Sequence, residues 1–280
     1  MTDGALEVIA RLGDIAGRYD AIFCDVWGVV HDGVAKNPDA EVALIEARAS
    51  GPRVVLLTNS PRPAAGVRDQ LDALGVSHDA YDAIVTSGDA TRALISAGPR
   101  AIFHIGAARD RDLFEGLDLE FRDEASAEVV VATGLFHDET ETPDDYRALL
   151  AALAARGLPM ICANPDIVVH RGERLIYCAG AIATAYGELG QVVHLAGKPH
   201  APIYDVAKAR LQRTEAKILC IGDGMFTDVK GANGIAADCL FIADGIHRDE
   251  LVVAGGDPAH LLGELAARGL TARYVQPALR

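Results

Sequence analysis

Short, continuously apolar runs recur along this chain and are separated by longer amphipathic stretches. Most of the runs do not alternate in polarity, which is typical of strands covered on both faces in a parallel sheet. Three of the amphipathic stretches open with proline, which favours the first turn of a helix. The sequence therefore predicts an α/β fold built on an open parallel sheet. The expected strands are Ala21–Asp25, Val54–Thr58, Ala83–Thr86, Ala101–Ile105, Val129–Ala132, Met160–Ala163, Val192–Ala196, Ile218–Gly222 and Cys239–Ala243, and the proline-led helices are Pro63–Leu74, Pro143–Arg156 and Pro202–Gln212.

Composition excludes several classes of partner and location. The net charge of −14 repels nucleic acid and anionic membrane surfaces, so we expect neither as a partner. No apolar run approaches the roughly 20 residues of a membrane span, and the acidic N-terminal stretch is unlike a signal peptide. The five cysteines have neither CxxC nor zinc spacing, which indicates buried free thiols in a reducing compartment. We expect a cytoplasmic protein.

Polar residues with chemical potential follow several of the predicted strands. Asp25 ends the first strand, and Thr58, Asn59 and Ser60 end and follow the second. Ligands of open α/β sheets bind beyond the carboxyl ends of the strands, so we expect these side chains near a ligand. Lys198 follows the run that ends at Ala196, and Asp223 and Asp228 follow the run that ends at Gly222.

The types of these residues point to phosphate chemistry. The Asp25 carboxylate can attack phosphorus and form an aspartyl phosphate. A Mg²⁺ ion prefers oxygen ligands, which Asp25, the backbone carbonyl of Trp27 and Asp223 can supply. Lys198 can neutralise phosphoryl oxygens, while Thr58 and backbone N–H groups near Asn59 can hold them. Taken singly, each residue has a simpler interpretation as a helix cap, a turn or a solvated side chain.

Four motifs in order, FCDVWGVVHDG, LLTNS, GKP and GDGMFTD, resemble those of the haloacid dehalogenase-like (HAD) superfamily of phosphohydrolases. The chain looks most like class IIA, the p-nitrophenyl phosphatase-like branch, which has an α/β cap between the second and third motifs. The elements Asn164-Pro165-Asp166 and TSGDAT (86–91) are similar to elements of that branch. The resemblance implies a Rossmann-like core formed by residues 1–87 and 192–280, and a cap formed by residues 88–191.

Carried over to this sequence, the resemblance assigns a role to each strand-end residue. It implies that Asp25 is the nucleophile and a Mg²⁺ ligand, that Asp223 is a metal ligand, and that Asp228 supports the metal through water or orients Lys198. Thr58 and Asn59 are implied for phosphate binding and Lys198 for charge neutralisation. The residues expected to contact the substrate are Trp27, Gly28, Ser60, Asn164 and Asp166.

The chain departs from the family pattern at Trp27. Family phosphatases usually have at this position a second aspartate, which protonates the leaving oxygen and then activates water. An indole cannot transfer a proton at neutral pH, and general acid–base help is typically worth roughly 10²- to 10⁴-fold. Two interpretations of the nearby His31 stay open: it partly replaces the missing aspartate, or HDG is a surface turn. Trp27 itself either packs or stacks on an aromatic leaving group.

The leading prediction is a Mg²⁺-dependent phosphatase that hydrolyses small phosphomonoesters through an aspartyl phosphate on Asp25. The expected partner is a small phosphorylated metabolite, such as a sugar, nucleoside, pyridoxal or aryl phosphate or phosphoglycolate, and a homodimer is left open. A second hypothesis is phosphotransfer to an acceptor other than water. A third is a phosphate-ligand binding or regulatory protein with vestigial activity.

Overall fold

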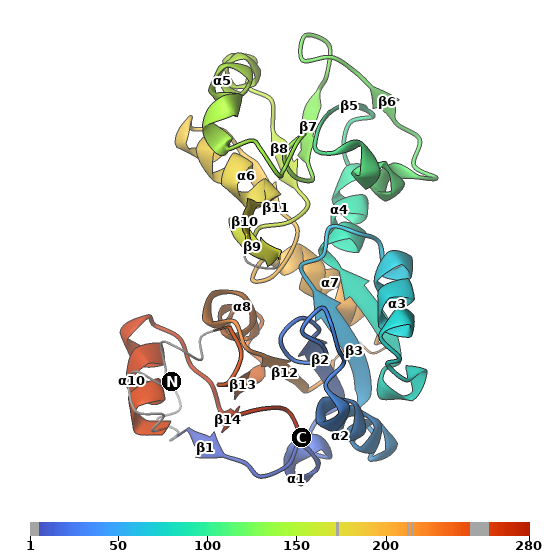
Figure 1. Ribbon diagram of the computed structural model, residues 1–280, viewed down its shortest axis with the longest axis vertical. Helices are drawn as coiled ribbons and strands as arrows, with labels where there is room; N and C mark the ends of the chain where they lie inside the picture. The colour runs from blue at the N-terminus through green and yellow to red at the C-terminus, as the bar shows by residue number, and fades with distance from the viewer. Residues whose placement is uncertain (1–5, 172–173, 212, 214, 247–257) are drawn as a thin grey trace. The chain divides into compact units, whose positions relative to one another are not determined.

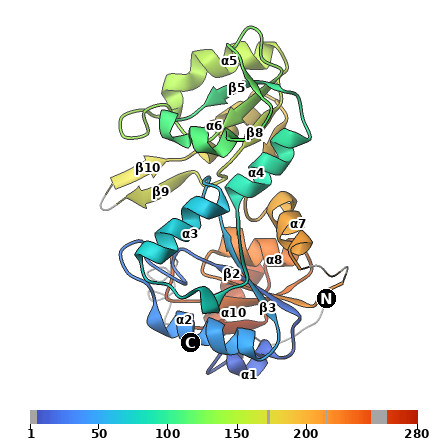
Figure 2. The same cartoon turned by 90° about the vertical axis from the view of Figure 1, so that its right-hand side faces the viewer.

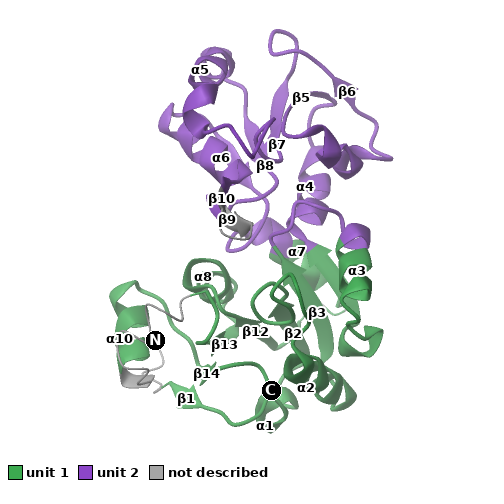
Figure 3. Ribbon diagram, viewed as in Figure 1, with its two compact units in different colours: residues 1–58, 67–85, 204–280 green, residues 59–66, 86–203 purple. Residues whose placement is uncertain are grey.

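The computed structural model describes residues 6–171, 174–211, 213, 215–246 and 258–280. The chain divides into two compact units (Figure 3). Unit 1 consists of residues 1–58, 67–85 and 204–280, and unit 2 consists of residues 59–66 and 86–203. Each unit contains a sheet whose described strand pairs are parallel, which confirms the predicted α/β fold.

The sheet of unit 1 has seven strands in the order β1-β14-β13-β12-β2-β3-β4 (Figure 1). All five residues of β2 are buried, as are all five of β12, which explains why these runs are continuously apolar. Helices α2 and α8 contact β3 and β13. The strands are β1 (Glu7–Val8), β2 (Ala21–Asp25), β3 (Arg53–Thr58), β4 (Ala83–Thr86), β12 (Ile218–Gly222), β13 (Asp238–Ile242) and β14 (Tyr274–Gln276); the helices are α1 (Gly13–Ala16), α2 (Pro38–Ala49), α3 (Ala64–Ala73), α7 (Ala201–Ala209), α8 (Lys230–Gly234) and α10 (Pro258–Ala267), with short turns η1 (His78–Ala80) and η4 (Met225–Val229).

The register of this sheet brings three predicted site residues to one edge. In the β12–β2 pair Ile221 lies opposite Cys24, so Asp25 and Asp223 both fall at the carboxyl end of the sheet. In the β2–β3 pair Asp25 lies opposite Leu57, and Thr58 is the next residue. Because parallel strands all end at the same edge, residues far apart in the sequence meet there.

Unit 2 has a five-stranded sheet in the order β11-β8-β7-β5-β6 and a separate β9–β10 hairpin (Figure 2). Its helix α4 begins with a capping box in which Thr86 and Asp89 bind each other's backbone N–H groups. The strands are β5 (Ala101–Ile105), β6 (Glu120–Phe121), β7 (Val129–Ala132), β8 (Met160–Cys162), β9 (Val168–Arg171), β10 (Arg174–Tyr177) and β11 (Val193–Leu195); the helices are α4 (Ser87–Ser96), α5 (Arg147–Ala155) and α6 (Ala179–Glu188), with η2 (Ala108–Phe114) and η3 (Pro143–Tyr146).

The predicted elements and the described ones agree closely, apart from the domain limits. Each of the nine expected apolar runs contains a strand, and the proline-led stretches hold α3, η3 with α5, and α7; the expected helix end at Gln212 lies outside the described residues. The sequence places the second boundary at 192, whereas β11 pairs with β8 and belongs to unit 2. Residues 59–66 also group with unit 2. The five cysteines are buried and free, as predicted.

Among the helices in the described part of the chain, none combines the length and the apolar character that a membrane span requires.

Candidate metal centre and phosphate site

Asp25 is the last residue of β2, and only 8% of its surface is exposed. The backbone N–H of Val26 donates a hydrogen bond to its Oδ1 at 2.8 Å. This bond fixes the carboxylate at the point where the strand ends. The side chain that the sequence singles out as a nucleophile is therefore held at the carboxyl edge of the unit 1 sheet.

Asp25, Asp223 and Asp228 form a cluster in which ligand atoms from the three carboxylates lie within 4.8 Å of one another. All three side chains are buried. Three carboxylates this close repel one another, and burial strengthens the repulsion because water screens it less. A divalent cation with oxygen ligands would offset that repulsion. The structure thus brings together the three predicted metal-binding carboxylates.

Backbone N–H groups and one hydroxyl orient two of these carboxylates. The N–H of Ile246 donates to Asp223 Oδ2 at 2.8 Å. The N–H of Gly224 and the hydroxyl of Thr227 donate to Asp228 Oδ2 at 3.1 and 3.3 Å.

Glycines make the space that the carboxylates occupy. A Cβ atom built on Gly28 would lie 2.3 Å from Asp223 Oδ2, and one on Gly245 would lie 2.1 Å from Asp223 Cβ. Gly28 also has a φ of +84°, a conformation that other residues rarely adopt. The oxygen-only donor set and this close approach of the backbone fit a small hard cation such as Mg²⁺.

The loop after β2 holds Trp27 at its exposed side. The Trp27 side chain is 54% exposed and meets His31 edge to face, with ring centroids 5.2 Å apart. The N–H of Gly28 donates to the carbonyl of His31 at 2.8 Å, so that amide is already engaged within the loop. The predicted contact of Gly28 with substrate, and the Trp27 carbonyl as a metal ligand, stay predictions.

His31 is 3% exposed, so the interpretation of HDG as a surface turn is wrong for this residue. Its Nδ1 accepts a hydrogen bond from the N–H of Gly33 at 2.9 Å. Burial lowers the pKa of His31, although the charge of Asp32 acts in the opposite direction. A histidine in this environment is neutral at pH 7 and is a poor proton donor to a leaving group.

Thr58 and Asn59 mark the point where the chain passes from unit 1 to unit 2. Thr58 ends β3 at the same sheet edge as Asp25 and is buried. In unit 2 the Asn59 amide donates to Asp166 Oδ1 at 3.1 Å and to the carbonyl of Lys198 at 3.2 Å. Its Oδ1 accepts from the N–H of Lys198 at 2.7 Å. The Asn59 side chain therefore positions Lys198 and Asp166, and the phosphate contact predicted for Asn59 stays a prediction.

The remaining predicted residues of unit 2 lie in the same network. Asn164 is buried, and its Oδ1 accepts from the N–H of Asp166 at 2.9 Å. Lys198 is 3% exposed. The Ser60 hydroxyl accepts from the N–H of Arg62 at 3.3 Å, within the segment that leads from Asn59. Unit 2 thus gathers Asn59, Asn164, Asp166 and Lys198, and unit 1 gathers the three carboxylates.

Several site residues are not predicted by the sequence reasoning. The Ser87 hydroxyl is buried without a hydrogen-bond partner, and a Cβ on Gly197 would lie 2.8 Å from it. The TSGDAT element contains this serine and could have identified it. Thr227, Gly245 and Ile246, which support Asp228 and Asp223, carried weaker signals. Among these weaker signals, the dipeptide Asp244-Gly245, which follows β13 after Ala243, is the one that indicates the end of a strand at the sheet edge.

Comparison with known proteins agrees with this architecture. Residues 22–120 match a family model described as haloacid dehalogenase-like hydrolase, and residues 195–267 match one described as HAD-hydrolase-like. The chain is 50% identical to a haloacid dehalogenase-like hydrolase from Brucella suis 1330, covering 98% of this chain and 100% of that one with a TM-score of 0.82. No curated protein matches the chain significantly.

Two further solved structures are more distant. A glycerol phosphate phosphatase from Mycobacterium tuberculosis, crystallised with magnesium, is 26% identical with a TM-score of 0.67, covering 83% of this chain and 70% of that one. A 4-nitrophenylphosphatase from Thermotoga maritima is 23% identical with a TM-score of 0.73, covering 94% and 96%, and shows the fold alone. The chain belongs to the haloacid dehalogenase-like hydrolase family, and its α/β cap between the second and third motifs places it in class IIA.

Proposed function

We propose that this protein is a divalent-metal-dependent phosphatase that hydrolyses small phosphomonoesters through an aspartyl phosphate on Asp25. The observation that carries the proposal is the buried cluster of Asp25, Asp223 and Asp228 at the carboxyl edge of the sheet. Similarity to a glycerol phosphate phosphatase crystallised with magnesium and with calcium supports both the reaction and the cation. Asp25, Asp223 and Asp228 would hold Mg²⁺, which supplies positive charge against the phosphoryl oxygens.

In the first half of the reaction an Asp25 carboxylate oxygen attacks phosphorus, and the bond from phosphorus to the leaving oxygen breaks. Lys198 binds phosphoryl oxygens through its ammonium group, and Thr58 donates its hydroxyl to one of them. In the second half water attacks phosphorus, and the bond to Asp25 breaks, which releases phosphate and restores the carboxylate. The chain's residues thus act by positioning and by charge.

The leaving oxygen needs a proton that Trp27 cannot give. Aryl and acyl phosphates tolerate this absence because their leaving groups are stabilised anions, whereas alkyl phosphates release a strongly basic alkoxide. We therefore propose that substrates with good leaving groups are preferred, and that the exposed Trp27 ring stacks on an aromatic one. Asn164 and Asp166 would contact the substrate from the cap.

The direct test is a phosphate-release screen over small phosphoesters with Mg²⁺, comparing the wild type with Asp25→Asn. The expected result is turnover of at least one ester that falls by roughly 10³-fold or more in the variant. The exposed residue Asp69 provides the control, because Asp69→Asn removes the same charge in α3 and should leave turnover unchanged. Turnover that survives Asp25→Asn would overturn the proposal.

Phosphotransfer to an acceptor other than water is a second candidate, and the environment of His31 favours it. The Nδ1 atom of buried His31 already accepts the N–H of Gly33, which puts the ring proton of the neutral form on Nε2. No ring lone pair is then left to activate water in place of the missing aspartate, and burial weakens the histidine as a base, so the aspartyl phosphate would be long-lived. Acid quenching during turnover would then trap phosphate on Asp25. Rapid hydrolysis without any accumulated phosphoprotein would exclude this candidate in favour of simple hydrolysis.

A further inference from the structure

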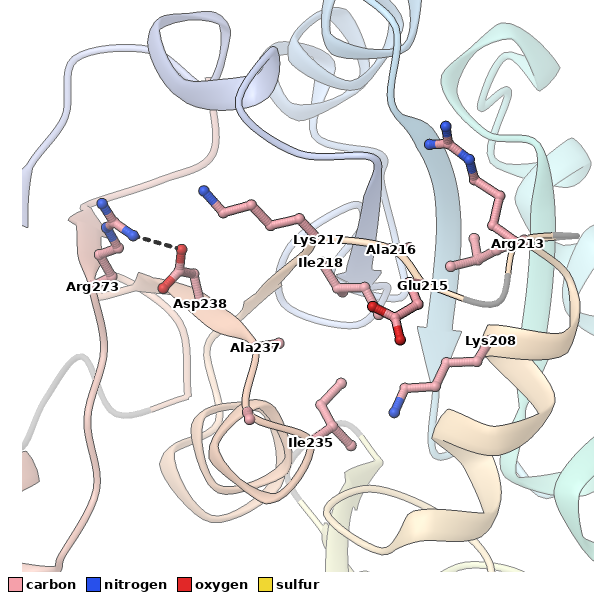
Figure 4. A pocket seen from close by; sticks show the side chains of 12 residues that line it. Lys208, Arg213, Glu215, Ala216, Lys217, Ile218, Ile235, Ala237, Asp238 and Arg273 are labelled. Atoms are coloured by element: carbon pink, nitrogen blue, oxygen red, sulfur yellow. Dashed lines mark hydrogen bonds and ion pairs between the residues drawn. The ribbon is translucent and has the colours of Figure 1, made fainter. Parts of the chain in front are cut away.

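A cavity of about 470 Å³ opens at the amino ends of β12 and β13 in unit 1 (Figure 4). Ile218 is the first residue of β12 and Asp238 the first of β13, and both line the cavity. Asp223 directly follows the other end of β12. The cavity is therefore separated from the carboxylate cluster by the length of the strands and needs its own explanation.

The cavity wall is basic although the chain as a whole is acidic. Four cations line it, Lys208, Arg213, Lys217 and Arg273, against two carboxylates, Glu215 and Asp238. The whole chain has 26 basic and 40 acidic residues, so the ratio of charges is reversed here. A locally positive cavity on a negative protein selects a small anion and does not attract a large polyanion, which the rest of the surface repels.

Part of this charge is already neutralised within the protein. Arg273 pairs with Asp238 at 2.9 Å, and Arg213 binds Asp20. The Tyr19 hydroxyl donates to the same Asp238 oxygen at 2.6 Å. Burial and this bond raise the pKa of Tyr19, so the phenol stays a donor. Arg273 and Tyr19 thus compensate the negative charge of Asp238, which therefore repels a bound anion only weakly.

Two lysines are left for a ligand. Within the described part of the chain neither Lys208 nor Lys217 has an ion pair with a carboxylate, and the Lys217 ammonium lies 4.8 Å from the centroid of the Tyr19 ring. Both lysines are exposed, so their ammonium groups can move to a ligand at little cost. Apolar side chains complete the wall at Leu211, Ile218 and Ile235.

The backbone of the cavity wall is strained at Ala236. Its φ is +56°, and it is the one non-glycine residue with positive φ in the described ranges. This region is less favourable for alanine than for glycine, and such strain concentrates at functional sites. Ala236 lies in the turn that leads from α8 into β13.

We propose that this cavity binds a small organic anion that carries a phosphate or carboxylate group on an apolar body. Figure 4 shows the ammonium groups of Lys208 and Lys217 on different sides of the cavity, with the Glu215 carboxylate between them, so the acidic group pairs with both only after these exposed side chains change rotamer. The apolar body packs on Leu211, Ile218 and Ile235. Two charge-assisted contacts and one apolar wall are a typical recognition set for a metabolite of this class. The proposal does not depend on the reaction at Asp25.

Calorimetric titration with phenylphosphonate, in EDTA to exclude binding through a metal, tests the proposal. The expected result is saturable binding that weakens tenfold or more in the Lys208→Gln/Lys217→Gln double variant. Arg210→Gln is the matched control, since Arg210 is exposed, follows α7 and does not line the cavity; it should bind like the wild type. Asp25→Asn should also keep the affinity, because the catalytic cluster is elsewhere.

Three results would overturn the proposal. They are the absence of saturable binding, unchanged affinity in the double variant, and a changed affinity in Asp25→Asn, which would assign the heat to the phosphate site. Inorganic phosphate and benzoate form the remaining arms. Inorganic phosphate should bind about tenfold more weakly than phenylphosphonate because it lacks the apolar body, and equal affinities would refute the apolar contact. Benzoate binding that also depends on the two lysines would support the part of the proposal that the cavity binds carboxylates.

Discussion

The ring of His31 meets the ring of Trp27 edge to face, with centroids 5.2 Å apart and planes at 75°. Beneath the indole lies Gly33, where a Cβ atom would come within 2.4 Å of the Trp27 ring. His31 is fixed in turn by the N–H of Gly33, which donates to its Nδ1. These contacts connect the three residues of the loop, and Trp27 therefore occupies a defined place at the position where the family pattern has an acid.

Replacing this indole by a carboxylic acid should restore the missing proton transfer. We expect Trp27→Asp to raise kcat/KM for an alkyl phosphate such as glycerol phosphate by roughly 10²-fold, with a smaller effect on an aryl phosphate. Trp27→Asn is the matched control, because asparagine has the same size as aspartate but cannot give up a proton. The ratio of alkyl to aryl kcat/KM is the measurement. A ratio that rises equally in both variants would show that the ring acts through bulk alone.

His31 should not be the acid that takes over from the missing aspartate. Burial lowers its pKa from the ordinary value of 6.5, and its Nδ1 is engaged with Gly33, so the neutral form prevails above pH 6.5 in the folded protein. We expect the shape of the pH–rate profile of His31→Gln to match the wild type over this range, even if kcat falls because the loop is disturbed. A limb of the profile that disappears in the variant would establish His31 as a titrating catalytic group.

Gly28 should be indispensable for metal binding. A methyl group there would lie 2.3 Å from Asp223 Oδ2, and its φ of +84° is unfavourable for alanine. We expect Gly28→Ala to weaken Mg²⁺ affinity by tenfold or more, measured by calorimetry, and to reduce turnover at limiting Mg²⁺. Gly13→Ala is the control, since nothing lies within 4 Å of a Cβ at that position in α1. Equal Mg²⁺ affinities of the two variants would contradict the proposed site.

The strand-end residues show how far sequence reasoning reaches. Asp25 and Asp223 each follow a continuously buried run, and local periodicity is enough to place them at strand ends. Their proximity depends on β12 pairing with β2, which are almost 200 residues apart in the chain. Nothing in either run specifies that neighbour, since both are equally apolar. The proximity of the two carboxylates was predicted by the order of the four motifs along the chain, which resembles that of the family, and not by periodicity.

Other features depend on tertiary contacts that leave little trace in a sequence. The sequence of β11 is as apolar as that of a strand in the unit 1 sheet, yet β11 pairs with β8 and belongs to unit 2, together with Lys198. The hairpin β9–β10 was missed because charged residues interrupt its apolar pattern. His31 lies in a polar HDG tripeptide that is typical of a surface turn, and its burial follows from the packing of Trp27 and Gly33 around it.

The cap provides a pH-dependent test of stability that is independent of catalysis. His104 binds the hydroxyl of Thr133 at 2.9 Å, and Thr133 donates to Asp110 at 2.7 Å. Burial, helped by the nearby positive charge of Arg111, lowers the pKa of His104 from 6.5 to about 4. The unfolded chain therefore takes up a proton on this residue below about pH 6.5, whereas the folded protein does so only near pH 4.

It follows that His104 reduces the free energy of unfolding as the pH falls from 6.5 towards 4. The variant His104→Gln can keep the bond to Thr133. From pH 7 to pH 5 we expect its free energy of unfolding to fall by about 1–2 kcal/mol less than that of the wild type, measured by urea unfolding. Asp110, whose pKa is raised by burial, is present in both proteins. The exposed residue His194 on β11 gives the control, since His194→Gln should lose as much stability as the wild type. The same loss in His104→Gln as in the wild type would mean that His104 is protonated in the folded cap at pH 5.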